Sequence, residues 1–169
     1  DSQRLYGGGA FSLVGGAVRR RIAAVDLGTA TLSNWRVQAQ EPVSTLAIAH
    51  GALFAGGGFG GYPGGGGEPR NYVAAFDLGS GATLPFSPRP SMVYTSGLAF
   101  HADRVLLIGG AADALEWVDR TSGAPVPPAT AVGGFASAAV QVGNTVFVAG
   151  VKMDRTGVLV VVDAPSGRL

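Results

Sequence analysis

A chain of 169 residues with 47% hydrophobic and only 14% charged side chains is long enough to bury the core of one domain. Twelve basic and eleven acidic residues give a net charge of +1, which argues against binding to nucleic acid or to an anionic membrane surface. The chain has no cysteine, which excludes disulfides and thiolate metal ligands, and no apolar run reaches the roughly 18 residues of a membrane-spanning helix.

The N-terminal segment from Leu5 to Phe11 reads LYGGGAF, and a close copy, LFAGGGF, begins at Leu53. Self-similarity at a spacing of about 50 residues is typical of repeat folds such as β-propellers. The repeats therefore predict the fold before any single residue does.

A five-residue run that ends in Asp is the next recurring pattern. It occurs at Ile22–Asp26, Val73–Asp77, Leu115–Asp119 and Leu159–Asp163, each time with a Ser or Thr three residues after the Asp. An Asp side chain placed this way accepts hydrogen bonds from backbone N–H groups two or three residues on, which stabilises an Asx turn. Because a turn is needed in every repeat and a catalytic pair only once, we expect these carboxylates to be structural.

A Ser heads the third pattern, in which two short apolar segments flank a two-residue turn. The pattern begins at Ser44, Ser96 and Ser137, and its turns are His50-Gly51, Ala102-Asp103 and Gly143-Asn144. It predicts a β-hairpin in each repeat. The first segments are rich in alanine, which suits the crowded innermost strand of a propeller blade: Ala47, Ala49, Ala99, Ala136, Ala138 and Ala139. The pairs Gly56-Gly57 and Gly109-Gly110 end the second segment, where we expect a bulge or a positive φ.

A Pro-containing segment closes the repeat near Trp35, Phe86 and Pro128. Proline has no N–H for a neighbouring strand, so we place this segment at the outer edge of the sheet. Four short strands in each repeat describe a propeller blade. No window keeps the apolar spacing of a helix without a Gly or Pro inside it.

The predicted fold is all-β, a single β-propeller segment over residues 1–169 with about 3.5 four-stranded antiparallel blades. The blades are expected at about 5–43, 44–95, 96–136 and 137–169. The first lacks its first strand and the last lacks its last strand. Three explanations fit such an arc: the chain belongs to a longer polypeptide, which we favour, two copies complete one ring, or a small four-bladed ring closes by pairing its ends.

The sequence offers no catalytic, cofactor-binding or metal-binding residues. His50 and His101 fall at hairpin turns, and no nearby carboxylates have the spacing of a zinc or calcium site. The Gly-rich stretches lack the Lys and Ser/Thr of a phosphate-binding loop. Trp35 and Trp117 occupy different points of the repeat, so we expect both to be packing residues.

Two further features have both a structural interpretation and a functional one. Arg19 and Arg70 hold equivalent positions in the first two repeats, and we expect a solvated strand entrance there rather than a ligand contact. The insert Gly60 to Pro69 (GGYPGGGGEP) is flexible by composition. Its Tyr62 and Glu68 are weak candidates for contact with a partner.

The first two repeats resemble bacterial propeller repeats with a pattern close to GGxFxxxGGxxRxxIAxxD. The matching residues are Gly8-Gly9, Phe11, Gly15-Gly16, Arg19 and Ile22 to Asp26, then Gly57-Gly58, Phe59, Gly65-Gly66, Arg70 and Val73 to Asp77. The later repeats depart from it and look more like kelch or quinoprotein-type blades. The resemblance implies a propeller and an extracellular, periplasmic or envelope-associated bacterial protein, and it carries no active site across.

Our leading hypothesis for function is a non-catalytic β-propeller scaffold or interaction module that presents loops to a protein or glycan partner, as a structural subunit of an envelope-associated assembly. The partner would be another protein or the remaining blades of the same propeller, with no cofactor. The alternative is a fragment of a propeller enzyme, a quinoprotein-like oxidoreductase whose catalytic residues lie outside this segment.

Overall fold

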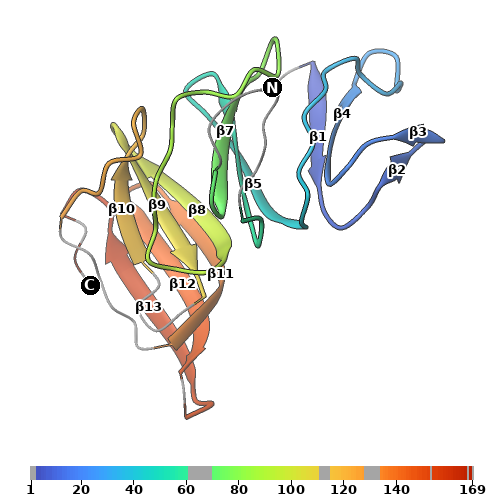
Figure 1. The fold of residues 1–169 in the computed structure, drawn as a ribbon. Helices are drawn as coiled ribbons and strands as arrows, with labels where there is room; N and C mark the ends of the chain where they lie inside the picture. The colour runs from blue at the N-terminus through green and yellow to red at the C-terminus, as the bar shows by residue number, and fades with distance from the viewer. Residues whose placement is uncertain are drawn as a thin grey trace. The chain divides into compact units, whose positions relative to one another are not determined.

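The computed structural model describes residues 3–60, 70–110, 115–127, 134–152, 154–166 and 168. The regular secondary structure of these residues consists of β-strands alone (Figure 1). The chain divides into two compact units, Asp1–Pro85 (unit 1) and Phe86–Leu169 (unit 2). The predicted all-β class is confirmed.

Unit 1 contains two main sheets. In the first sheet, β1 (Arg4–Gly8) pairs antiparallel with β4 (Ile22–Asp26). The hairpin between them is β2 (Leu13–Val14) and β3 (Ala17–Val18), joined by Gly15 and Gly16, whose φ angles of 56° and 80° favour glycine. The second sheet has the order β5-β6-β7 and consists of β5 (Val43–Ala49), β6 (Ala52–Gly57) and β7 (Val73–Asp77).

Unit 2 contains two three-stranded antiparallel sheets. The first has the order β10-β9-β8 and the second β11-β12-β13. Their strands are β8 (Thr95–His101), β9 (Arg104–Gly109), β10 (Leu115–Asp119), β11 (Gly134–Val142), β12 (Thr145–Lys152) and β13 (Gly157–Asp163). In each sheet the Ser-headed strand, the following strand and the strand ending in Asp are neighbours, as the repeat pattern predicts.

The fourth segment of each repeat is barely a strand. It joins the preceding strand through single bridges, at Val25↔Leu32, Phe76↔Thr83, Val118↔Pro125 and Asp163↔Arg168. Proline lacks the N–H that would extend such a ladder. Pro85 follows the bridge of the second repeat, and Pro125 is itself the bridged residue of the third. In the second and third repeats the four segments of a blade are therefore present in the expected order, with the outermost reduced to one bridged residue.

A β-bulge recurs at the start of each three-stranded sheet. The pairing register skips one residue at Ser44, Ser96 and Ser137, so the Ser that marks the repeat is the bulged residue. The bulge expected at Gly56-Gly57 and Gly109-Gly110 lies instead in the first strand of the hairpin, opposite Gly57 and Gly109. The positive φ expected at Gly56-Gly57 and Gly109-Gly110 is wrong, because the positive-φ glycines of the described residues are elsewhere.

Close approach of the bulged strand explains the glycines instead. A Cβ on the glycine opposite the bulge would overlap a backbone carbonyl oxygen of the neighbouring strand. The three pairs are Gly57 with Pro42, Gly109 with Tyr94, and Gly150 with Phe135. Glycine is thus required at the same point of three repeats by the lack of room for a side chain.

Each unit has a hydrophobic core between its two sheets. In unit 1, Ile22 and Ala24 of β4 and Tyr6 of β1 face Leu53 and Phe76 of the second sheet. Trp35 joins this core with its ring centroid 5.2 Å from that of Tyr6, in an edge-to-face arrangement, and its Nε1 donates to the Asp77 carbonyl at 3.1 Å.

In unit 2 the core lies between the two three-stranded sheets. The first sheet contributes Leu106, Ile108, Leu115 and Trp117, and the second contributes Val146, Val148 and Val162. Both tryptophans are buried packing residues, as expected.

Candidate functional site

The four recurring aspartates cap the turns that follow them. Asp77 Oδ1 accepts from the backbone N–H of Gly79 at 3.1 Å and of Ser80 at 2.7 Å, and from the Ser80 hydroxyl at 2.7 Å. Asp26, Asp119 and Asp163 make the same bonds to the Ser or Thr three residues on. These carboxylates are therefore committed to turn structure, as the sequence predicts.

These hydrogen bonds also set the acidity of the carboxyl groups. The backbone N–H and then the hydroxyl of Ser80 hold the pKa of Asp77 below its ordinary value of 3.8. The pKa values of Asp26, Asp119 and Asp163 are lowered by the same two groups of Thr29, Ser122 and Ser166. A folded-state pKa below the unfolded value stabilises the fold above the unfolded pKa, and that stabilisation is lost as the pH falls through the folded one.

Replacing Asp77 by alanine is expected to lower the Tm by about 3 °C at neutral pH, the shift that the loss of one cap produces in a chain of this size. Thermal unfolding followed by circular dichroism measures it. Asp77→Asn is the matched control, because the amide oxygen still accepts the turn N–H groups but does not titrate. This control should keep more of the Tm and lose less stability than the wild type below pH 4. An alanine variant with the wild-type Tm would contradict the capping role.

Arg19 and Arg70 are not solvated, so the expectation of a strand entrance in water is wrong for both. Arg19 is 4% exposed and Arg70 is 7% exposed. Arg19 donates to the carbonyls of Val18 at 2.9 Å and Ser33 at 3.0 Å, and Arg70 donates to the carbonyl of Leu84 at 3.2 Å. Each guanidinium supplies the charge-assisted bonds that tie the start of the Pro-containing segment to the repeat, which is why the sequence keeps it in both copies.

The histidines do not converge with other ligands. His50 is an exposed turn residue with φ 49°, and His101 ends β8 half-buried. The described residues contain no group of three His, Asp or Glu side chains placed to hold a metal ion. Tyr62 and Glu68 lie outside the described residues.

Among the residues that the structure describes, no helix is long and apolar enough to cross a bilayer.

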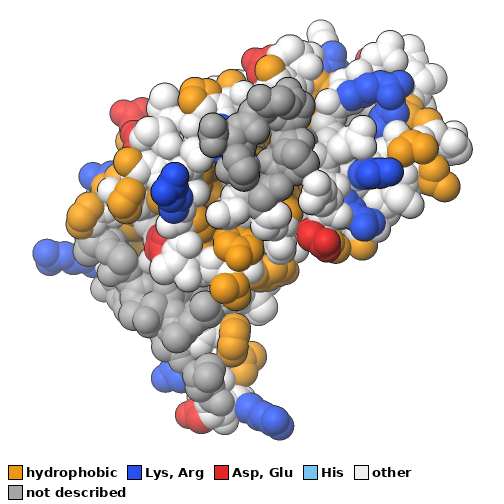
Figure 2. Space-filling view, in the orientation of Figure 1, with side chains coloured by type: hydrophobic (Ala, Val, Ile, Leu, Met, Phe, Trp, Pro, Cys, Tyr) orange, Lys and Arg blue, Asp and Glu red, His pale blue; other side chains and the backbone are white. Residues whose placement is uncertain are grey.

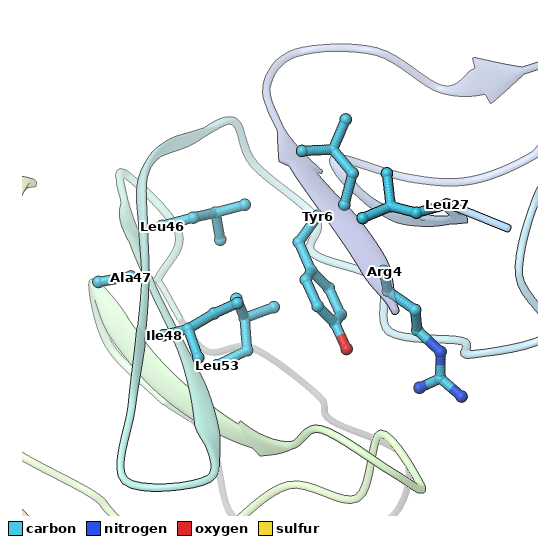
Figure 3. A pocket seen from close by; sticks show the side chains of 8 residues that line it. Arg4, Tyr6, Leu27, Leu46, Ala47, Ile48 and Leu53 are labelled. Carbon is cyan, nitrogen blue, oxygen red and sulfur yellow. The ribbon is translucent and has the colours of Figure 1, made fainter. Parts of the chain in front are cut away.

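A groove of about 370 Å³ in unit 1 is the feature most suited to binding (Figure 3). It runs between β1 and the β5-β6 hairpin. Its lining residues are Arg4, Leu5, Tyr6, Leu27, Leu46, Ala47, Ile48 and Leu53. Figure 3 shows the Tyr6 ring between the Leu53 side chain of the hairpin and Arg4 of its own strand. The Arg4 guanidinium donates to the Leu78 carbonyl at 2.8 Å, so one polar group already has a fixed partner at the rim.

The position of this groove corresponds to a strand in unit 2. There, β9 takes the place of β1 in the repeat and β11 the place of β5, and β8 lies between them, paired with β9 and packed beside β11. The sheet order places β4 on one side of β1, and the groove lies along the other side. Because the groove follows the edge of β1, residues from both faces of β1 line the groove. The groove therefore has the place and the apolar lining of a site for one extended strand.

A second hollow of about 320 Å³ lies in unit 2 and is more polar. It is lined by Ser87, Arg89, Glu116, Val118, Ser122, Gly123, Ala124 and Pro125. Glu116 already accepts from the backbone N–H of Ser91 at 2.8 Å. The Gly123 backbone packs closely against Pro88, so this hollow lies between the Pro-containing segment of the second repeat and the third repeat.

No model of a known protein family matches this sequence, and no curated protein is significantly similar to it. Solved structures do match the fold. The computationally designed protein Ika4 aligns with a TM-score of 0.60 and 20% identity, over 82% of this chain and 78% of its own. The designed protein Ika8 gives 0.62 and 20%, over 98% of this chain and 48% of its own.

BamB from Moraxella catarrhalis, a β-propeller, aligns with a TM-score of 0.53 and 21% identity over 87% of this chain. The match covers 44% of BamB, so the chain spans less than half the length of BamB and of Ika8. Identities this low show the fold alone. The repeated antiparallel sheets and these neighbours together make the chain a partial β-propeller.

Proposed function

We propose that this protein is a non-catalytic β-propeller scaffold that binds a protein partner by accepting an extended strand in the groove along β1. The observation that carries the proposal is the groove itself, with its lining of Leu5, Leu27, Leu46 and Ile48. Apolar pockets along a sheet edge are used to recognise extended peptides, whose main chain pairs with the sheet while alternate side chains fill the pockets.

The chemistry of the lining favours protein over glycan. Glycan recognition needs several polar groups that converge on hydroxyls, whereas this groove presents leucine and isoleucine side chains with Arg4 and Tyr6 at one end. The Tyr6 hydroxyl donates to the Leu78 carbonyl at 3.4 Å, so it serves the rim of the groove. We also propose an extracellular, periplasmic or envelope location, which rests on the resemblance of the first two repeats to bacterial propeller motifs. The blade boundaries at 44, 96 and 137 remain predictions.

A labelled peptide with the sequence of residues 95–101, TSGLAFH, is the probe for this groove, because β8 fills the corresponding place in unit 2. We expect saturable binding by fluorescence anisotropy. Ile48→Asp places a charge in the apolar lining and should weaken binding by about tenfold or more.

Leu13→Asp is the matched control for the peptide experiment. Leu13 is also an exposed apolar residue of unit 1, but it lies in the β2-β3 hairpin and outside the groove, so this variant should bind as the wild type does. A scrambled peptide should not bind. The absence of saturable binding, or equal binding by the Ile48 variant, would overturn the proposal.

A further inference from the structure

The sheet β11-β12-β13 has one apolar face that no described residue covers. Its exposed side chains include Val140 at 58%, Leu159 at 67% and Val161 at 46%. The register places Val140, Phe147 and Val161 side by side across the three strands. Figure 2 shows hydrophobic side chains at the surface over β11 and β12. Scattered apolar residues on a surface are ordinary, but a continuous row across a sheet marks an interaction surface.

The repeat identifies what kind of face this is. The two sheets of unit 2 can be aligned by the bulged Ser and by the Asp that ends the third strand. In this alignment, six residues of the first sheet occupy the same positions as six residues of the second. They are Gly97, Ala99, Leu106, Ile108, Leu115 and Trp117, matched by Ala138, Val140, Phe147, Ala149, Leu159 and Val161. The first set is buried beneath the second sheet and the second set is exposed. We call the face that carries these positions the leading face.

We call the opposite face of each sheet its trailing face. A leading face packs against the trailing face of the next sheet along the chain. In unit 2 the trailing face of the second sheet presents Val146, Val148 and Val162 to the leading face of the first. In unit 1 the equivalent residues Leu53, Ala55 and Phe76 pack against Tyr6, Ile22 and Ala24, which occupy leading positions of β1 and β4. Both cores are therefore formed by a leading face packed against a trailing face. The surface that would cover Val140, Phe147 and Leu159 is accordingly a trailing face.

The trailing face of β1 is exposed at Leu5. Leu5 of β1 corresponds to Leu53 and Val146, which are buried, yet Leu5 is 63% exposed. The first sheet thus exposes a trailing residue and the last sheet exposes a whole leading face. Two copies placed head to tail would cover both, since the same unlike faces meet within each unit. The alignment of 98% of this chain with 48% of Ika8 is also what two copies of the chain in one such body would give.

We infer that the leading face of β11-β12-β13 is the docking surface for a second copy of this chain, which covers it with the trailing face of its β1-β4 sheet. Leu5 also lines the strand groove proposed above, so the experiment separates the two proposals through Ile48, which lines the groove, and Leu159, which lies on the leading face. Such a contact is heterologous, with Val140 and Leu159 on one side and Leu5 on the other. A heterologous contact closes into a ring when the rotation between copies permits it, and we infer a closed pair of chains.

Sedimentation velocity of the full chain at micromolar concentration tests the inference. The wild type should be a dimer. Leu159→Asp and Leu5→Asp should each be monomeric, because either substitution puts a charge into both contacts of the pair. Val18→Asp is the control: Val18 is an exposed apolar residue of the β2-β3 hairpin, and this variant should remain dimeric. Circular dichroism checks that each variant is folded.

Mixing the two monomeric variants tests the direction of packing. A head-to-tail pair of Leu159→Asp with Leu5→Asp keeps one unaltered contact, so a heterodimer should appear on mixing. A wild-type monomer would overturn the inference. So would a Leu5→Asp variant that dimerises fully, since the leading face would then pack on itself. Ile48→Asp should stay dimeric and Leu159→Asp should still bind the 95–101 peptide, so failure of one proposal is distinguishable from failure of the other.

Discussion

Replacing Trp117 by alanine is expected to lower the free energy of unfolding of unit 2 by about 3–5 kcal/mol. The side chain is only 1% exposed and lies in the core between the two sheets of that unit, among Leu106, Leu115, Val146 and Val162. The substitution removes the largest side chain of this core and leaves a cavity that the paired strands cannot close, because their hydrogen-bond ladders fix the spacing of the backbone. Urea unfolding followed by circular dichroism measures the loss.

Trp117→Phe is the matched control, and it isolates the indole N–H from the bulk of the ring. Trp117 Nε1 is buried and has no acceptor among the described residues. Phenylalanine keeps most of the apolar volume and removes a polar group that makes no hydrogen bond, so its cost should be less than half that of alanine. Equal losses for Trp117→Phe and Trp117→Ala would contradict this account. They would mean that Nε1 has a partner in solution.

The repeat could be predicted from sequence because its signals are local. The run from Val73 to Asp77, the Ser three residues beyond it and the two-residue hairpin turns each fit within a few residues, and each describes one strand or turn. The Asp77 turn and the His50-Gly51 hairpin accordingly have the predicted structure. Recurrence then supports the order of the strands, because one unit that folds this way implies the others.

The burial of Arg19 and Arg70 could not be predicted in the same way. A buried guanidinium needs acceptors, and here these are the carbonyls of Ser33 and Leu84, each 14 residues further along the chain. Charge alone favours solvent, so a local interpretation places the side chain outside. Recurrence is the signal in the sequence that indicates burial. An arginine that occurs at the same position of two repeats, next to a buried strand, has a hydrogen-bond acceptor within the repeat.

The groove was missed for a similar reason. Its lining comes from β1, β5, β6 and Leu27, which follows β4, so Tyr6 and Ile48 meet only after the two sheets of unit 1 are packed. The glycine pairs show a different case, in which the sequence marks the residues and a bulge, but not the strand that carries the bulge. A positive φ is a property of one residue, whereas the approach of Tyr94 to Gly109 depends on the bulge in the neighbouring strand.

Gly109→Ala tests that cause, and it is expected to lower the free energy of unfolding by about 3 kcal/mol. The added methyl group would overlap the Tyr94 carbonyl oxygen and would lie 2.6 Å from Met92 Sδ. The carbonyl cannot simply move away, because it accepts the Gly110 N–H at 3.0 Å and this bond belongs to the bulged end of the β8-β9 pair. The strand must therefore shift or give up the bond. Denaturant unfolding of unit 2 measures the cost.

Gly157→Ala is the control for this substitution. Gly157 also lies in a strand of unit 2, but a Cβ there meets nothing within 4 Å and its φ is not positive. Alanine reduces the entropy of the unfolded chain at such a position, so this variant should be unchanged or more stable by up to about 1 kcal/mol. If both glycines tolerated alanine equally, the bulged strand would not approach as closely as the structure has it. The recurrence of glycine opposite Ser44, Ser96 and Ser137 would then need another explanation.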